Sequence, residues 1–134
     1  MNYRELRGML RGDEGFSSTI YTDTTGHQTI GYGRNLAAGI SRTEAEFLLD
    51  TDMRIAVEDL NRAFPWWQGM HEDAQLSLAN MCFNLGLPKL LTFHRMLEAL
   101  ENNDYETAAD ECLDSKWAKQ VGNRAKRIAA LFRK

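Results

Sequence analysis

Residues 72–85 form the segment that most restricts how this chain can fold. Its apolar side chains fall on nearly every face of a helix instead of forming one stripe: Ala74, Leu76, Leu78, Ala79, Met81, Cys82, Phe83 and Leu85. In a soluble protein, a helix of this kind is stable when other helices surround it. The sequence therefore predicts a helical bundle with residues 72–85 in its core.

The residues before this segment show two other patterns. Apolar residues recur at helical spacing from Tyr3 to Leu10, which predicts a helix over residues 2–14 that ends at Gly15. Residues 16–32 contain two β-forming stretches separated by the turn-forming residues 23–26, which predicts a hairpin. Residues 41–44 (SRTE) have the form of a capping box, and a long amphipathic helix follows them.

These patterns predict an α+β fold in a single domain. The 134 residues suffice for one hydrophobic core, and no stretch rich in serine and glycine offers a linker. We expect a small hairpin lobe at about residues 12–40, a helix joining the lobes at about 41–64, and a helical lobe at about 65–134. No run of eighteen apolar residues exists, so we expect no transmembrane segment and no stable membrane insertion.

The cysteines and histidines indicate no metal centre. Cys82 and Cys112 lie in segments predicted to be helical and have no neighbours at metal-ligand spacing, so we favour two reduced core thiols over a disulfide. The three histidines, His27, His71 and His94, share no motif, and the sequence assigns them no chemistry. We therefore expect neither a metal nor an organic cofactor.

Charge is distributed unevenly along the C-terminal third of the chain. The net charge of −3 argues against a general polyanion binder, and we expect no nucleic-acid partner. Residues 98–114 nevertheless contain seven acids and no bases, and residues 116–134 contain seven bases and no acids. Two interpretations stay open: solvated helix faces of opposite sign, or a basic wall that helps to hold an anionic polymer.

Two carboxylates suit the chemistry of glycosidic bond cleavage. This reaction needs one carboxylic acid to protonate the leaving oxygen and a second carboxylate to activate water or attack the sugar. Glu14 ends the first helix, where the negative end of the helix dipole favours its protonated form by a few tenths to ~1 kcal/mol, and Asp23 lies in the hairpin turn. On spacing alone, such a pair is more often solvated surface than an active site.

The surrounding residues make the pair specific. Residues 13–16 (DEGF), 20–23 (IYTD) and 29–33 (TIGYG) closely resemble the active-site signature of phage-type lysozymes, or endolysins, of glycoside hydrolase family 24. The resemblance implies a lysozyme-like fold in which a long helix joins the two lobes. It also implies that Glu14 is the proton donor, that Asp23 is the second carboxylate, and that Thr29 supports the attacking water.

A second set of residues carries the same resemblance. Residues 80–86 (NMCFNLG) look like the central helix of the family, and residues 115–117 and 123–127 look like its C-terminal block. By this resemblance, Asn80 and Phe83 face the substrate, and Arg124 lies close to Glu14. Phe83 also has a plainer interpretation as a core residue, because its neighbours are apolar. An adjacent arginine lowers the pKa of a carboxyl group, whereas burial and a helix end raise it.

The chain departs from the pattern after the TIGYG motif. Larger relatives carry histidine where this chain has Arg34, and Asp52 stands where the family has the ionic partner, so we predict an Arg34–Asp52 pair. The connection from Arg34 to Ser41 is also shorter than in larger relatives. We therefore expect the N-terminal lobe to lack their extra strand and small helix.

The resemblance implies a muramidase that hydrolyses the β-1,4 bond between N-acetylmuramic acid and N-acetylglucosamine in peptidoglycan. We expect inversion, with the carboxyl groups about 6.5 to 9.5 Å apart across a cleft between the lobes. We also expect a monomer that accumulates in the host cytoplasm without a signal peptide and depends on a separate holin. Three alternatives stay open: a lytic transglycosylase, a non-catalytic wall-binding or virion protein, and partial lysis by the basic amphipathic segment 123–134.

Overall fold

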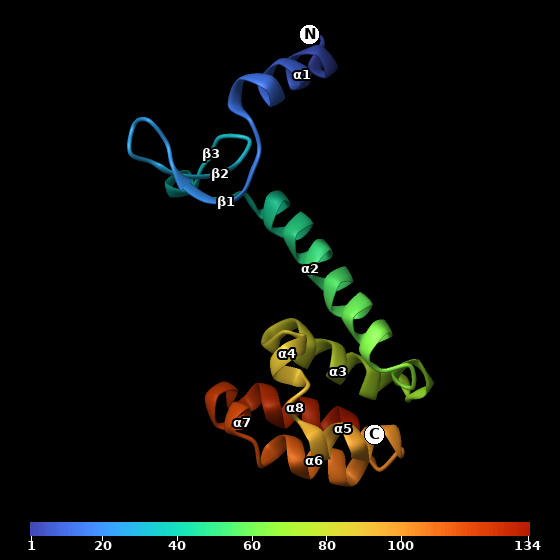
Figure 1. The fold of residues 1–134 in the computed structure, drawn as a ribbon. Helices are drawn as coiled ribbons and strands as arrows, with labels where there is room; N and C mark the ends of the chain where they lie inside the picture. Colours follow the sequence, from blue (N-terminus) through green and yellow to red (C-terminus); the bar gives the residue numbers. More distant parts are fainter. The chain divides into compact units, whose positions relative to one another are not determined.

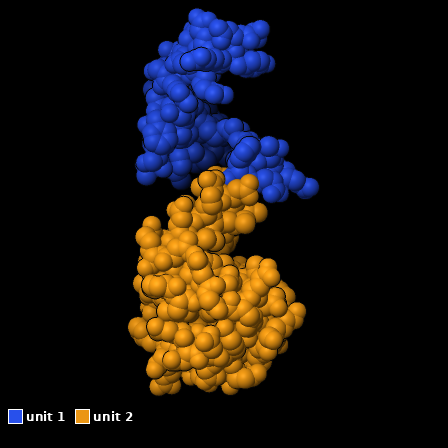
Figure 2. All heavy atoms as spheres, turned by 90° about the vertical axis from the view of Figure 1, so that its right-hand side faces the viewer, with its two compact units in different colours: residues 1–47 blue, residues 48–134 orange.

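The computed structural model describes all 134 residues, which form two compact units, residues 1–47 and residues 48–134 (Figure 2). The fold is α+β, as predicted: the first unit contains a small antiparallel sheet, and the second unit is helical (Figure 1). Helix α2 (Arg42–Ala63) contains the boundary between the units and agrees with the helix predicted there. No helix is both long enough and apolar enough to cross a membrane.

The first helix, α1 (Tyr3–Glu14), ends as predicted and begins one residue later than predicted. The side chain of Asn2 accepts a hydrogen bond from the backbone N–H of Glu5 at 2.9 Å and caps the helix. Gly15 has a φ of 68°, which favours glycine, and its N–H donates to the carbonyl of Arg11 at 3.1 Å. These contacts make Glu14 the last helical residue.

The hairpin is present, and it is part of a larger sheet than predicted. Strands β1 (Ser17–Thr22), β2 (Gln28–Gly31) and β3 (Arg34–Asn35) pair antiparallel in that order, and the 3-10 helix η1 (Leu36–Ala38) follows. The expectation that an extra strand and a small helix are absent was therefore wrong.

Two glycines explain the additional strand. Gly31 and Gly33 have φ values of 67° and 77°, and they reverse the chain within three residues. The reversal brings Arg34 opposite Ile30 and Asn35 opposite Thr29. The Asn35 side chain then accepts a hydrogen bond from the N–H of Ala37 and begins η1. The tight turn at Gly31 and Gly33 lets β3 and η1 form within the short connection between β2 and α2.

The predicted capping box starts α2. The N–H of Ser41 donates to Oε1 of Glu44 at 3.1 Å, and the N–H of Glu44 donates to Oγ of Ser41 at 3.2 Å. Each side chain thereby satisfies a backbone donor that has no partner within the helix.

The second unit is the predicted helical bundle (Figure 1). After α2 it contains η2 (Trp67–Gly69), α3 (Glu72–Leu85), α4 (Leu87–Leu90), α5 (His94–Glu101), α6 (Tyr105–Leu113), α7 (Lys116–Val121) and α8 (Asn123–Phe132). Helix α8 packs against α3, α6 and α7, and α5 packs against α6. The large side chains at the centre of this core are Leu60, Leu78, Met81, Leu90, Met96, Leu100, Ile128 and Phe132.

Helix α3 supplies part of this core, though not from every face. Leu78 and Met81 are fully buried, whereas Leu76 is 57% exposed and Phe83 is 42% exposed. The prediction of a helix surrounded on all sides is therefore corrected for the second unit: within it, α3 has one apolar face that the other helices do not cover. Cys82 and Cys112 are free thiols, and both are buried, as expected.

Candidate functional site

Glu14 lies against the turn that joins β2 to β3. A Cβ atom added to Gly33 would come within 2.6 Å of Oε2 and 3.0 Å of Cδ of Glu14. The Glu14 carboxyl group thus lies close to the backbone of residue 33, in space that the Cβ atom of any residue other than glycine would occupy. On the α1 side, Glu14 lines a concave surface of about 540 Å³ together with Leu10 and Tyr32.

Asp23 occupies the tip of the β1–β2 hairpin, as predicted. Its Oδ1 accepts three hydrogen bonds: from the N–H of His27 at 2.8 Å, from the N–H of Thr25 at 2.9 Å, and from the hydroxyl of Thr25 at 2.9 Å. Backbone bonds between Asp23 and residues 26 and 27 close the turn. Because every one of these side-chain bonds ends on Oδ1, Oδ2 accepts none.

These bonds favour the ionised form of Asp23. The N–H of His27 has the largest effect in lowering the pKa of the Asp23 carboxyl, partial desolvation opposes it, and the bonds from Thr25 lower it further. Asp23 is therefore a carboxylate at neutral pH, with one oxygen held by the turn and the other free. A group in this state can accept a proton from water.

Thr29 lies in the central strand β2 and is the only buried residue of the first unit, with 2% of its surface exposed. Its hydroxyl donates to the carbonyl of His27 at 2.9 Å. Its proton is therefore in use, and only its acceptor capacity remains for a water molecule. Thr29 and Asp23 are linked through the same residue, His27, because both bond to its backbone. The support of a water molecule by Thr29 stays a prediction.

Arg34 forms an ion pair that the sequence did not predict. Its Nη1 lies 2.5 Å from Oε2 of Glu44, so the ion pair forms with the capping-box residue. Asp52 belongs to the other unit, and its predicted pairing with Arg34 stays a prediction.

The predicted substrate-contacting residues lie in the second unit. Asn80 and Phe83 on α3 and Arg124 on α8 line one groove of about 450 Å³, which also includes apolar residues of α2. Nε of Arg124 donates to Oδ1 of Asn80 at 2.9 Å. The exposure of Phe83 favours a groove wall over the core interpretation. Glu14 belongs to the other unit, and its expected proximity to Arg124 stays a prediction.

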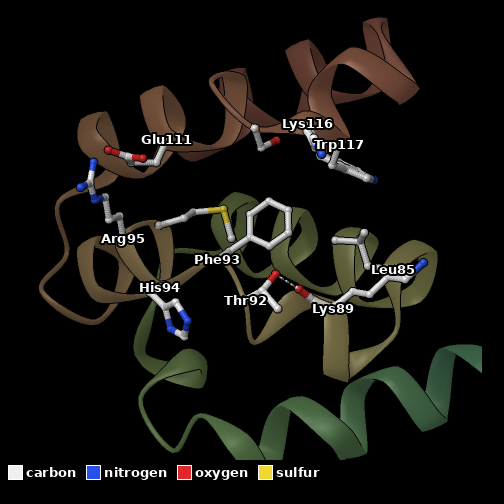
Figure 3. Close-up of a pocket in the computed structure, with 11 residues that line it drawn as sticks. Leu85, Lys89, Thr92, Phe93, His94, Arg95, Glu111, Lys116 and Trp117 are labelled. Carbon is white, nitrogen blue, oxygen red and sulfur yellow. Dashed lines mark hydrogen bonds between the residues drawn. The ribbon is translucent and has the colours of Figure 1, made fainter.

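The second unit contains another cavity that the sequence did not indicate. It has a volume of about 510 Å³ and is lined by residues from the end of α3 to α7 (Figure 3). Phe93 and Trp117 form an edge-to-face aromatic pair in its lining, with ring centroids 6.5 Å apart, and Lys89, Lys116 and Glu111 add charge. The helical unit therefore offers more than one concave surface.

The structure adds three residues to those singled out by sequence: Gly33 beside Glu14, and Thr25 and His27 around Asp23. The turn sequence itself carried a signal for the last two. An aspartate at the start of a turn commonly accepts hydrogen bonds from residues two to four positions later. Nowhere do three or more His, Cys, Asp or Glu side chains meet in an arrangement that could hold a metal ion.

Comparison with known proteins gives consistent matches. The phage lysozyme family model matches residues 11–134. The chain is 30% identical to the pre-baseplate central spike protein Gp5 of Enterobacteria phage T4, over 92% of this chain and 27% of that protein. It is 25% and 26% identical to the probable T4-type lysozymes 2 and 1 of Dictyostelium discoideum, in each case over 95% of this chain and 92% of the relative. The chain thus spans about a quarter of the spike protein and nearly all of the two lysozymes.

Proposed function

Since this chain belongs to the phage lysozyme family, we propose that it is a muramidase that hydrolyses the β-1,4 bond between N-acetylmuramic acid and N-acetylglucosamine in bacterial peptidoglycan. The observation that carries the proposal is the contrast between two carboxyl groups of one unit. Asp23 is held ionised by three donors on one oxygen, whereas Glu14 ends a helix and rests against Gly33.

The two groups divide the reaction between them. Glu14 donates its proton to the glycosidic oxygen as the bond from that oxygen to the anomeric carbon breaks. Asp23 accepts a proton from a water molecule through its free oxygen, and the water oxygen forms the new bond to the anomeric carbon from the opposite face. The configuration therefore inverts, which needs carboxyl groups about 6.5 to 9.5 Å apart. NMR of the first product would show the inverted anomer.

Asn80, Phe83 and Arg124 are proposed to contact the glycan from the second unit. Their groove combines an exposed aromatic face with an amide and a guanidinium group, and aromatic faces and hydrogen-bonding side chains together suit a sugar ring. The Arg124–Asn80 bond orients both polar groups before substrate arrives, which reduces the entropy lost on binding.

The decisive experiment measures new reducing ends released from isolated peptidoglycan. We expect Glu14→Gln and Asp23→Asn each to lower kcat by at least about 100-fold, because each removes one of the two proton transfers. Asp13→Asn is the matched control, since it removes a neighbouring exposed carboxylate from the same helix turn. Equal activity of Glu14→Gln and the native protein would overturn the proposal.

A virion-borne, binding-only protein is the second candidate, and the match to a spike protein of a phage favours it. If the chain only binds, the native protein and Glu14→Gln should both bind peptidoglycan, and neither of the two should release reducing ends. A lytic transglycosylase is separated from a hydrolase by mass spectrometry, because hydrolysis adds one water to the products and transglycosylation adds none.

A further inference from the structure

A chain of hydrogen bonds links His27 to Asp23 through the side chain of Thr25. The Thr25 hydroxyl lies 2.9 Å from Oδ1 of Asp23 and 2.7 Å from Nδ1 of His27. The same imidazole nitrogen lies 3.6 Å from Oδ2 of Asp23. All three residues belong to the five-residue tip of the β1–β2 hairpin, so the chain of contacts lies wholly within the first unit.

Counting protons fixes the direction of these bonds. The ionised Asp23 carboxylate has no proton and can only accept, so the single hydroxyl proton of Thr25 points to Oδ1. The hydroxyl oxygen must then accept from His27, which requires a proton on Nδ1. A neutral His27 is therefore in the Nδ1–H form, and Nε2 is left as an acceptor.

We propose that His27 is a positioning residue for Asp23: its Nδ1–H orients the Thr25 hydroxyl, which in turn fixes Oδ1 and leaves Oδ2 directed to the reacting water. This inference rests on the proposed role of Asp23 as the second carboxylate. His27 does not exchange a proton with substrate. It determines how the carboxylate is held, and its imidazole is half exposed, with 54% of the side chain accessible.

The surroundings of His27 contain no competing charge. Asp23 is the only charged group within ion-pair distance of the imidazole. The other side-chain hydrogen bonds at this end of the hairpin are uncharged: Nε2 of Gln28 donates to Oγ1 of Thr22 at 3.2 Å, and the Thr29 hydroxyl donates to the carbonyl of His27. Thr25 and Asp23 therefore supply the polar contacts of the imidazole.

The first test is the tautomer of His27, measured by ¹⁵N–¹H NMR of the imidazole at a pH where it is neutral. We expect the Nδ1–H form in the native protein and a shift towards Nε2–H in Thr25→Val, which removes the hydroxyl and keeps the size. Thr24→Val is the matched control, because Thr24 is exposed in the same turn and its hydroxyl makes no hydrogen bond. Thr25→Ser keeps the hydroxyl and should restore the native tautomer.

The second test is the dependence of kcat/KM on pH. Thr25→Val removes a donor that lowers the pKa of Asp23, so the acid limb moves to higher pH, and Thr24→Val leaves it in place. His27→Phe lowers kcat about three- to tenfold, as expected for one hydrogen bond, with KM unchanged. His27→Asn places an amide nitrogen near the position of Nδ1 and should recover most of the loss.

A neutral His27 in the Nε2–H form in the native protein would overturn the inference. So would identical acid limbs for Thr25→Val and Thr24→Val. The tautomer does not depend on hydrolysis, so it is measured equally well in a protein without activity. If Asp23→Asn retained hydrolysis while His27 was found as Nδ1–H, the hydrogen-bonded chain would stand and the proposed function of Asp23 would fail.

Discussion

Gly33 and Glu14 meet so closely that the Glu14 carboxyl group would have to move to admit any other residue: a Cβ atom at position 33 would lie 2.6 Å from Oε2 of Glu14. The contact places the carboxyl group against the backbone of the turn between β2 and β3. It also gives a physical reason for glycine at this position beyond its φ of 77°.

Gly33→Ala should therefore displace the Glu14 carboxyl group. Because a displacement of about 1 Å can cost 10²-fold in rate, we expect kcat to fall about 10- to 100-fold. Gly39→Ala is the matched control, since Gly39 has a similar φ of 74° and nothing within 4 Å of its added Cβ. Both variants should lose about 1 kcal/mol of stability from backbone strain, measured by urea unfolding. Equal losses of kcat in the two variants would contradict the steric explanation.

Phe83 and Met81 lie two residues apart on α3 and should respond in opposite ways to truncation. Met81 is fully buried, so Met81→Ala should cost about 2–5 kcal/mol in the free energy of unfolding and leave the activity per folded molecule unchanged. Phe83 is exposed in the groove, so Phe83→Ala should raise KM for peptidoglycan with a much smaller loss of stability. If Phe83→Ala were as destabilising as Met81→Ala, the core interpretation of Phe83 would be correct after all.

Glu44 should make stability depend on pH in acid. The N–H of Ser41 lowers the pKa of the Glu44 carboxyl most, and Arg34 lowers it further. A lowered folded-state pKa contributes stability above the ordinary pKa of the group, and this contribution is lost as the pH falls through the folded value.

The difference in stability between the native protein and Glu44→Gln should accordingly be present at neutral pH and disappear in acid. Denaturant unfolding at a series of pH values from neutral to strongly acidic measures it. Glu46→Gln, two residues along α2 and in no ion pair, should show no such pH dependence. A constant difference between native protein and Glu44→Gln at all pH values would show that the carboxylate charge is unimportant.

The two cysteines should be unreactive in the folded protein. Burial raises the pKa of the Cys112 thiol to about 11 and also raises that of Cys82. For Cys112, this corresponds to about 100-fold less thiolate than an ordinary thiol at the same pH. Alkylation with iodoacetamide, followed by mass spectrometry, should label both cysteines in denaturant and neither in buffer; rapid labelling of the folded chain would contradict their burial.

Sequence was sufficient wherever the interacting groups lie within a few residues of one another. Gly15 ends α1 through a hydrogen bond four residues back, Ser41 and Glu44 cap α2 through bonds three residues apart, and Asp23 is held by its own turn. Backbone geometry dictates such contacts once the helix or turn forms, so the pattern of residues predicts them. His27 lies just as close to Asp23 in the chain, yet its role was not predicted; the turn-forming aspartate before it was the available signal.

Other features depended on how distant parts of the chain meet. Arg34 pairs with Glu44 ten positions later, Gly33 receives the carboxyl group of a residue nineteen positions earlier, and Arg124 bonds to Asn80 across forty-four residues. A helical or strand pattern states which face is apolar, but it does not state which neighbour occupies that face. In the first unit, the path of the backbone through Gly31 and Gly33 decides the third strand and the surroundings of Glu14.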